Sequence, residues 1–303
     1  MAKIVGIGAC VMDTLISVPH YPKEDTKLRA EQLRPAGGGP VGTGLVAAAK
    51  LGADCAYIGT LSDDSGGLFL MEDFRKYRVG TEHITLQKGY RSFTSCIWLS
   101  REGGTRTCVF DKGTLPPLAL SDSQKQAIRQ ASVLMVDGNE LDAAVEGAKI
   151  ARKNGVRVLY DAGGLYPNVQ RLLEHTDILI PSEEFALKFT GEGSAEAAAK
   201  QLFDRFHPEV VVITQGSRGG ILYDGKEVQP YPAFPTEVAD SNGAGDVFHG
   251  AFAAAAAMGY SYPNCCLLAS ATSSLKCRGV GARESAPDLA SVLEFLSMQG
   301  IAL

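Results

Sequence analysis

The most constraining feature of this 303-residue chain is a regular alternation of short apolar runs and amphipathic segments in its second half. Runs of four or five mainly apolar residues lie at 133–136, 156–160, 177–180 and 210–214. Segments with helical spacing lie between or after them, at 141–153, 168–174, 183–189 and 195–206. Short apolar strands that alternate with helices are typical of a parallel sheet covered on both faces. The pattern predicts an α/β fold with a doubly wound, mostly parallel sheet.

The first half of the chain predicts the opening of the same sheet and a second, smaller one. Strands are expected at 3–9 and 54–59, and helices at 44–51 and 66–78. Two segments do not fit this alternation: 13–36, which is polar and extended, and 90–111, which predicts two strands around a turn at 102–104. We expect them to form a small β-sheet that projects from a single domain, 1–303. Because ligands of open α/β sheets bind outside the carboxyl ends of the strands, such a sheet could act as a lid.

Composition excludes several classes of function. Lys and Arg total 29 and Asp and Glu total 34, and a net charge of −5 argues against nucleic acid or an anionic membrane as the main partner. The longest apolar run, 246–258, is shorter than the ~20 residues of a membrane span. The N-terminal residues lack the layout of a secretory leader. The seven cysteines are an odd number without a CxxC pair, which argues against disulfides or zinc and predicts a cytoplasmic protein.

The residues that carry chemistry lie at 240–246, Asp-Ser-Asn-Gly-Ala-Gly-Asp, before a helix expected at 246–258. Small residues at a helix start leave free N–H groups, and the helix dipole adds positive charge, so this turn predicts an anion site for a phosphoryl group. Asp246 would repel phosphate but could accept a proton from an attacking hydroxyl. A helix N-terminus predicts a low pKa for it. The alternative is that Asp246 only caps the helix.

Three segments resemble the PfkB, or ribokinase-like, family of carbohydrate kinases. They are the family's C-terminal signature at 240–250, its N-terminal signature at 38–66 and its nucleotide-binding strand and turn at 212–220. They occur in the family's order and spacing, so the resemblance covers nearly the whole chain. It implies a doubly wound α/β core with a β lid, and transfer of the γ-phosphoryl group of ATP to a sugar hydroxyl.

The resemblance also implies roles for individual residues. Asp246 would be the catalytic base, with an anion hole at Gly243, Ala244 and Gly245. Sugar-binding positions match Asp13, Gly38 and Gly39. The nucleotide site is assigned to Ser182, Thr214, Gly216, Ser217, Gly219, Cys277 and Gly281. Family members often bind a monovalent cation near the anion hole, and here backbone carbonyls by Asp240 and Asn242 and the loop 278–285 could hold potassium.

Two departures from the family pattern concern the substrate and the metal. Thr43 stands where many members carry a sugar-binding Asn, and a hydroxyl does not reproduce amide geometry. The Asn-x-x-Glu motif near the phosphates and magnesium is replaced by Ser182 and Phe185, with Glu184 one residue away. We therefore assign no protein ligand to Mg²⁺ and expect ATP phosphates and water to supply most of its ligands.

Within the family, two subgroups look nearest. The chain resembles ketohexokinases at residues 21–29, 105–111 and 276–277. It resembles bacterial sulfofructose kinases at residues 37–40, 212–217 and 275–277. Lys27 could serve a sulfonate, but the stretch 137–140 holds acids and lacks an Arg, which favours a neutral ketose. Asp25 and Asn139 are expected to add sugar contacts, and Arg106 to clamp phosphate oxygens.

The prediction is an ATP-dependent kinase that phosphorylates a primary hydroxyl of a ketohexose such as fructose. A sulfofructose or nucleoside kinase is the alternative within the family. A non-catalytic sugar or nucleotide sensor on the same fold is the alternative from another class, and the intact Gly-Ala-Gly-Asp argues against it. Exposed edges of the lid strands would allow a homodimer.

Overall fold

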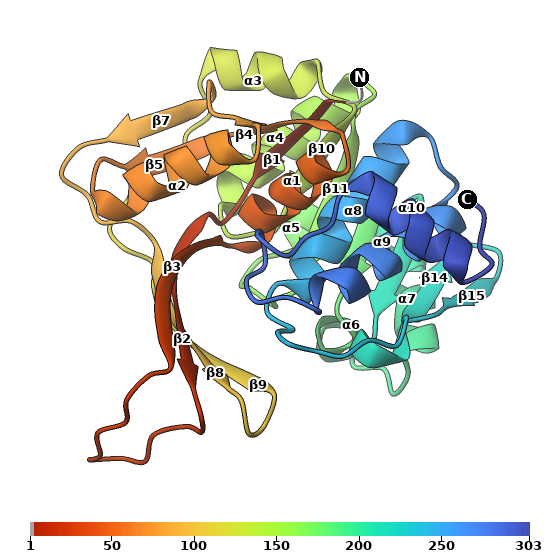
Figure 1. The fold of residues 1–303 in the computed structure, drawn as a ribbon. Coiled ribbons are helices and arrows are strands. Elements are labelled where there is room, and N and C mark those ends of the chain that lie inside the picture. Colours follow the sequence, from red (N-terminus) through yellow and green to blue (C-terminus); the bar gives the residue numbers. More distant parts are fainter. Residues whose placement is uncertain (1–2) are drawn as a thin grey trace.

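A nine-stranded sheet runs through the centre of the protein (Figure 1), whose computed structural model describes residues 3–303. The strand order is β15-β14-β13-β12-β11-β10-β1-β4-β6, parallel from β6 to β13 and antiparallel at β14 and β15. The strands are β1 (Lys3–Ile7), β4 (Asp54–Tyr57), β6 (Val79–Gly80), β10 (Val133–Val136), β11 (Arg157–Ala162), β12 (Ile178–Pro181), β13 (Val210–Thr214), β14 (Gly220–Tyr223) and β15 (Val228–Tyr231).

Helices cover both faces of this sheet, as the alternation predicts. One buried cluster contains side chains of α1 (Pro40–Lys50), α2 (Ser65–Lys76), α8 (Ala244–Met258), α9 (Tyr262–Lys276) and α10 (Leu289–Met298). The other contains side chains of α3 (Asp122–Arg129), α4 (Leu141–Lys153), α5 (Gln170–Leu173), α6 (Glu183–Thr190) and α7 (Ala195–Phe206). Successive strand residues enter opposite clusters, as Ile4 and Val5 do, because strand side chains alternate between faces. The doubly wound α/β fold is confirmed.

Most element bounds agree with the sequence pattern, and the differences have local causes. The predicted strand 54–59 is divided into β4 and β5 (Gly59–Ser62), and β5 pairs with β7 (Ile84–Gln87) in a separate two-stranded sheet. α1 starts earlier than predicted because Pro40 occupies its first turn. α5 is shorter than the predicted 168–174 because Asn168 has a positive φ. α8 begins two residues before the predicted start, which places Asp246 third in the helix.

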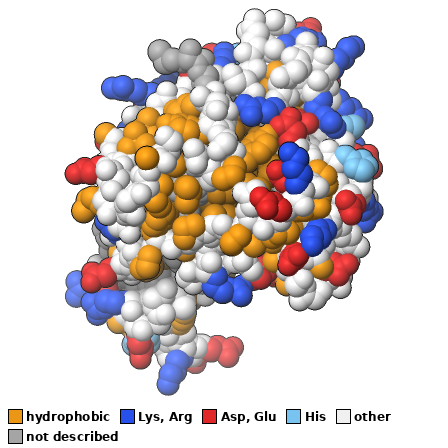
Figure 2. All heavy atoms as spheres, turned by 90° about the vertical axis from the view of Figure 1, so that its right-hand side faces the viewer, with side chains coloured by type: hydrophobic (Ala, Val, Ile, Leu, Met, Phe, Trp, Pro, Cys, Tyr) orange, Lys and Arg blue, Asp and Glu red, His pale blue; other side chains and the backbone are white. Residues whose placement is uncertain are grey.

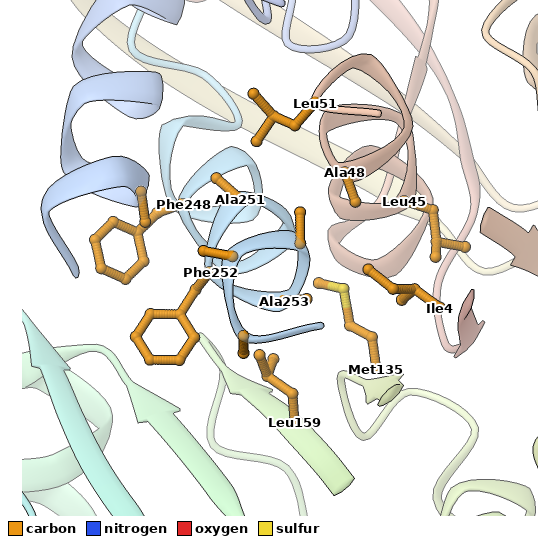
Figure 3. Packing of buried hydrophobic residues seen from close by; sticks show 14 of the residues in the cluster. Ile4, Leu45, Ala48, Leu51, Met135, Leu159, Phe248, Ala251, Phe252 and Ala253 are labelled. Atoms are coloured by element: carbon orange, nitrogen blue, oxygen red, sulfur yellow. The ribbon is translucent and has the colours of Figure 1, made fainter. Parts of the chain in front are cut away.

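Close contact between α1 and α8 fixes the start of α8 beside the start of α1. A Cβ on Gly250 would lie 2.0 Å from the Gly44 carbonyl oxygen, so the two backbones touch there. Figure 3 shows the labelled side chains of α1 on one side of α8 and the rings of Phe248 and Phe252, which belong to α8, on the other. The alanines of α8 permit this approach, since larger side chains would separate the helices.

A four-stranded sheet projects from the rest of the molecule (Figure 1), as the sequence predicts. Its order is β3-β2-β8-β9, with β2 (Val11–Val18), β3 (Gln32–Gly38), β8 (Thr94–Ser100) and β9 (Thr105–Asp111). It has a small core of its own, formed by Leu15, Ala36 and Ile97. Its outer end, at the bottom of Figure 2, carries charged side chains, whereas hydrophobic side chains gather higher on that face. We call this four-stranded sheet the projecting sheet.

Candidate active site

Two pockets meet at the N-terminus of α8, at the carboxyl ends of the parallel strands. The sheet-side pocket, of about 210 Å³, lies between the projecting sheet and the starts of α1 and α8; its lining includes Asp13, Gly38, Gly39, Thr43, Ser95, Asn139, Asn242 and Asp246. The α9-side pocket, of about 510 Å³, lies beyond the same turn; its lining includes Thr214, Gly216, Ser217, Gly219, Ala244, Gly245 and Cys277. Neighbouring residues of the turn at 242–246 thus line different pockets.

Asp13, on β2 of the projecting sheet, is a buried acid in the sheet-side pocket. Ser95 of β8 donates a 2.6 Å hydrogen bond to Asp13 Oδ1. Burial raises the pKa of Asp13 to about 6, and the Ser95 hydrogen bond and the Arg283 charge oppose the rise. A Cβ on Gly38 would lie 2.0 Å from Asp13 Oδ2, so the glycine keeps that oxygen accessible. The predicted neighbours Asp13 and Gly38 are therefore brought together.

Thr43 supplies a free hydroxyl in the same pocket. Its side chain is 1% exposed, and Oγ1 has no hydrogen-bond partner within residues 3–303. A buried, unpartnered hydroxyl is costly, and it is commonly kept where a ligand completes it. Gly39, the residue before α1, lines the pocket beside it. These positions agree with the predicted sugar-binding roles, which stay predictions.

Asp246 lies where the two pockets meet, and its surroundings correct one expectation. Burial raises its pKa to about 7, the carboxylate of Asp161 adds to the rise, and His249 and Arg106 oppose it. The predicted low pKa is therefore wrong, because loss of hydration outweighs the helix dipole at this position. A carboxylate with a pKa near neutrality is well matched to accept a proton near pH 7.

The turn before Asp246 has a backbone that only glycine adopts readily. Gly243 has φ +72°, and a Cβ there would lie 2.4 Å from the Ala282 Cβ. The N–H of Ala244 already donates to the Ser241 carbonyl at 3.2 Å, so this amide is shared between the turn and any bound anion. The anion-hole roles of Gly243, Ala244 and Gly245 stay predictions.

Behind Asp246 lies a buried pair that the sequence did not single out as functional. His249 Nδ1 lies 3.1 Å from Asp161 Oδ2, and His249 Nε2 donates to the Ile180 carbonyl at 3.0 Å. Burial raises the pKa of Asp161 well above its usual value and lowers that of His249. Asp161 is the penultimate residue of β11. A single acid at the end of an apolar strand is the sequence feature that could have indicated a functional role for it.

Arg106, on the exposed strand β9, reaches both sides of this turn electrostatically. Burial raises the pKa of Asp246 and that of Cys277, which lines the α9-side pocket, and the Arg106 charge opposes both rises. Arg106 lines neither pocket, and its predicted contact with phosphate oxygens stays a prediction.

Asn139 lines the sheet-side pocket as predicted and is held by Asp137. The Asn139 N–H and Nδ2 donate to Asp137 Oδ1 at 2.9 and 3.2 Å. Asp137 Oδ2 also accepts from the Ala9 N–H at 2.7 Å. The sequence analysis missed several further lining residues: Phe93, Ser95, Cys108, Phe110, Lys112 and Tyr166. The alternation of side chains between the two faces of β8 and β9 could have indicated that Ser95, Cys108 and Phe110 share the face of Asp13.

Besides Arg106, three further predicted residues are not brought to the expected pockets. Asp25 is exposed, with φ +56°, in the loop at the outer end of the projecting sheet, and it lines neither pocket. The Ser182 hydroxyl accepts from the Phe185 N–H at 3.1 Å as the cap of α6, and Ser182 does not line the α9-side pocket. Gly281 donates its N–H to Asp240 Oδ2 at 2.9 Å and lies outside that pocket as well. A single-residue match to a motif could not anticipate these positions.

Few acidic groups are placed to bind magnesium. Within residues 3–303, no cluster of three His, Cys, Asp or Glu side chains could hold a metal ion. Glu184 is exposed and pairs with Lys188, while Glu183 pairs with Arg218 and accepts from Gln215 Nε2 at 2.7 Å. The expectation that nucleotide phosphates and water supply most magnesium ligands stays a prediction.

Among residues 3–303, no helix is long and apolar enough to cross a membrane.

Comparisons with known proteins identify the class of protein to which this site belongs. A model described as "pfkB family carbohydrate kinase" matches residues 1–289, so the chain belongs to the PfkB family. It is a sugar kinase, a phosphotransferase that uses an alcohol as acceptor. The sensor alternative is thereby set aside.

Individual relatives named ribokinase and ketohexokinase are both similar to the chain. A ribokinase from Haemophilus influenzae is 28% identical over 297 residues, 96% of this chain and 97% of the relative. A ketohexokinase from Mus musculus is 25% identical over 258 residues, 82% of this chain and 86% of the relative. The structure of Arabidopsis thaliana ribokinase complexed with ribose and ATP is 27% identical with a TM-score of 0.86, covering 98% of this chain and 99% of that one.

Proposed function

We propose that this kinase transfers the γ-phosphoryl group of ATP to a primary hydroxyl of a neutral sugar, with a ketohexose such as fructose as the preferred acceptor. One observation carries the proposal: Asp246 lies at the junction of a pocket that contains the buried acid Asp13 and a pocket of small residues and hydroxyls. A sugar in the first and a nucleotide in the second would meet at the N-terminus of α8.

In the proposed reaction, Asp13 accepts hydrogen bonds from two sugar hydroxyls and Thr43 contacts a third. The primary hydroxyl then lies beside Asp246. Asp246 accepts its proton as the oxygen forms a bond to the γ-phosphorus and the bond to the bridging oxygen of ADP breaks. The amides at the start of α8 and the Arg106 guanidinium stabilise the phosphoryl charge. Magnesium, when bound with ATP, neutralises part of the phosphate charge.

The charges around the sheet-side pocket support a neutral acceptor over sulfofructose. Asp13 and Asp246 line the pocket, and the one Lys or Arg among its lining residues is the exposed Lys112. Lys27, the residue expected to serve a sulfonate, is exposed in the outer loop and lines neither pocket. A sulfonate would therefore meet more negative than positive charge.

A nucleoside acceptor is the second candidate, because an adjoining cavity of about 340 Å³ opens beside the sheet-side pocket. The two share Ala9, Phe93, Lys112 and Asn139. Its lining is partly apolar, including Tyr57, Leu61, Leu70, Leu115, Pro117 and Leu118. A base attached to the sugar could occupy this space.

We also propose that two copies pair through the projecting sheet. The strand register places Leu33, Ile16 and Trp98 in one row on the face opposite Asp13, and Val109 lies on the same face. Leu33 and Val109 are 64% and 68% exposed. Light scattering after size exclusion should give a dimer mass for the wild type and a monomer mass for Val109→Lys. A wild-type monomer at micromolar concentration would contradict the proposal.

The free cysteines and the use of ATP support a reducing cytoplasm as the place of action. All seven cysteines are unpaired, and five of them are buried. Burial raises the pKa of Cys10 to about 11, which makes this thiol unreactive. Packing, and not redox chemistry, accounts for such side chains.

The deciding experiment measures ADP release with magnesium and ATP against fructose, other ketohexoses, ribose, sulfofructose and adenosine. A kcat/KM for a ketohexose about tenfold above that for ribose supports the proposal. A preference for adenosine supports the second candidate. A preference for ribose overturns the ketohexose assignment while leaving the sugar kinase in place.

A further inference from the structure

Lys276 is a fully buried lysine beside the turn that carries Asp246, and the mechanism does not use it. It is the last residue of α9, and its side chain has no exposed surface. Its Nζ donates to the Asp240 carbonyl at 2.7 Å and lies 3.6 Å from Asp240 Oδ2. The C-terminus of a helix favours a positive charge, because the last carbonyl groups carry partial negative charge.

Asp240 connects the turn before α8 to the loop after α9. Its Oδ1 accepts from the Asn242 N–H at 2.8 Å, and its Oδ2 accepts from the Gly281 N–H at 2.9 Å. Its own N–H donates to the Cys277 carbonyl at 3.2 Å. Asp240 therefore joins the two segments expected to bind a monovalent cation, and the Lys276 ammonium group contacts Asp240 itself.

The residues present do not fit a separate potassium ion at this position. The expected ion would use the Asp240 carbonyl oxygen, but the Lys276 ammonium group already contacts that oxygen at hydrogen-bond distance. An ammonium group is close to potassium in size and equal to it in charge. A second cation on the same carbonyl would meet a like charge in a region with little water to screen it.

We propose that Lys276 is a built-in cation that takes the place of potassium and positions the turn 240–246, so that this kinase needs no monovalent cation. The independence of activity from monovalent cations rests on the proposed function. The positioning of the turn by Lys276 does not, since it concerns contacts within the protein.

The test compares wild type, Lys276→Ala and Lys50→Ala in potassium, ammonium and choline chloride at equal ionic strength. Lys50 is a matched control, because its Nζ donates to the Glu284 and Ala286 carbonyls of the same loop without contacting Asp240. Melting temperature is measured without sugar, so it tests the positioning of the turn even if the acceptor has been assigned wrongly. Phosphoryl transfer is measured with the best acceptor found.

The proposal expects wild-type melting within about 1 °C and wild-type kcat within about twofold across the three salts. Lys276→Ala should lose about tenfold or more in kcat in choline and regain part of it in ammonium or potassium, with a matching gain in melting temperature. Lys50→Ala should show no salt-specific gain. Potassium activation of the wild type by about tenfold overturns the proposal. So does a Lys276→Ala variant that is fully active in choline, or one that responds to the salts no more than Lys50→Ala. If Lys276→Ala does not fold, the wild-type comparison still decides.

Discussion

The sheet-side and α9-side pockets share one helix N-terminus but have opposite chemistry. The sheet-side pocket is lined by Asp13 and Asp246, whose pKa values burial raises to about 6 and about 7. The α9-side pocket contains no Asp, Glu, His, Lys or Arg among its lining residues and offers hydroxyls, small side chains and backbone. Under the proposed function, acceptor binding and proton transfer would depend on ionisation, whereas nucleotide binding would depend on shape and backbone geometry. Substitutions should therefore separate the two halves kinetically.

Replacement of Asp246 by Asn should have the largest effect. The amide keeps the shape of the side chain but cannot accept the proton, so kcat should fall by about 10²–10⁴-fold. ATP affinity, measured by calorimetry, should stay within about threefold because the α9-side pocket is unchanged. A variant that keeps more than about a tenth of wild-type kcat would remove Asp246 from the role of base.

Replacement of Asp13 by Asn should act on the acceptor alone. Loss of hydrogen bonds to a charged acceptor group costs about 1.5–3 kcal/mol, which corresponds to a rise of about 10- to 100-fold in KM for the sugar. The KM for ATP should not change. If both KM values rise together, the two pockets are coupled and the proposed separation is wrong.

Acid should inactivate the acceptor side first. Asp246 must be ionised to accept a proton, and its folded pKa is about 7. The kcat/KM for the sugar should therefore fall about tenfold per pH unit below 7, more steeply below 6 as Asp13 also protonates, and stay level above 7.5. An acceptor profile that is flat from pH 5.5 to 8 would contradict the assignment. Binding of an ATP analogue, corrected for titration of its phosphates, should change little over the same range.

Replacement of Thr43 by Val should have a smaller effect. The shape is retained and only the unpartnered hydroxyl is lost, so sugar KM should rise by about 3- to 10-fold. Folding stability should not fall, because the hydroxyl makes no hydrogen bond within the described protein. Thr43→Ser is the control that restores the hydroxyl. A Val variant with wild-type KM would show that Thr43 does not contact the acceptor.

The smallest expected effect is on stability, again through Asp246. Its pKa is near 7 when folded and near 4 when unfolded, so the native state binds more protons between pH 4 and 7. Stability of the ligand-free wild type therefore falls as pH rises through this window. Asp246→Asn should melt above wild type at pH 8, because its side chain carries no charge to desolvate, and equal to it near pH 4. A variant that melts lower at pH 8 would contradict the raised pKa.

Local sequence was sufficient where contacts are local. The four apolar strands of the second half, most of the helices and the projecting sheet follow from periodicity and turn residues, because each segment shows its buried face in its own pattern. The start of a helix after the small residues of 240–245 was also predictable, since such residues have a local geometric consequence; the anion site at this turn stays a prediction.

The tertiary structure decided whatever depends on segments that are distant in the chain. The pKa of Asp246 was mispredicted because burial and Asp161, about 85 positions earlier, outweigh its own helix. Asp25 matched a motif but lies in an outer loop. Lys276 came to Asp240 only through the packing of α9 beside α8. Sequence patterns were thus enough for the fold class and for nominating Asp246 as the base. Long-range packing set the ionisation of Asp246 and brought Lys276 to its turn, because electrostatic energies depend on distance and burial.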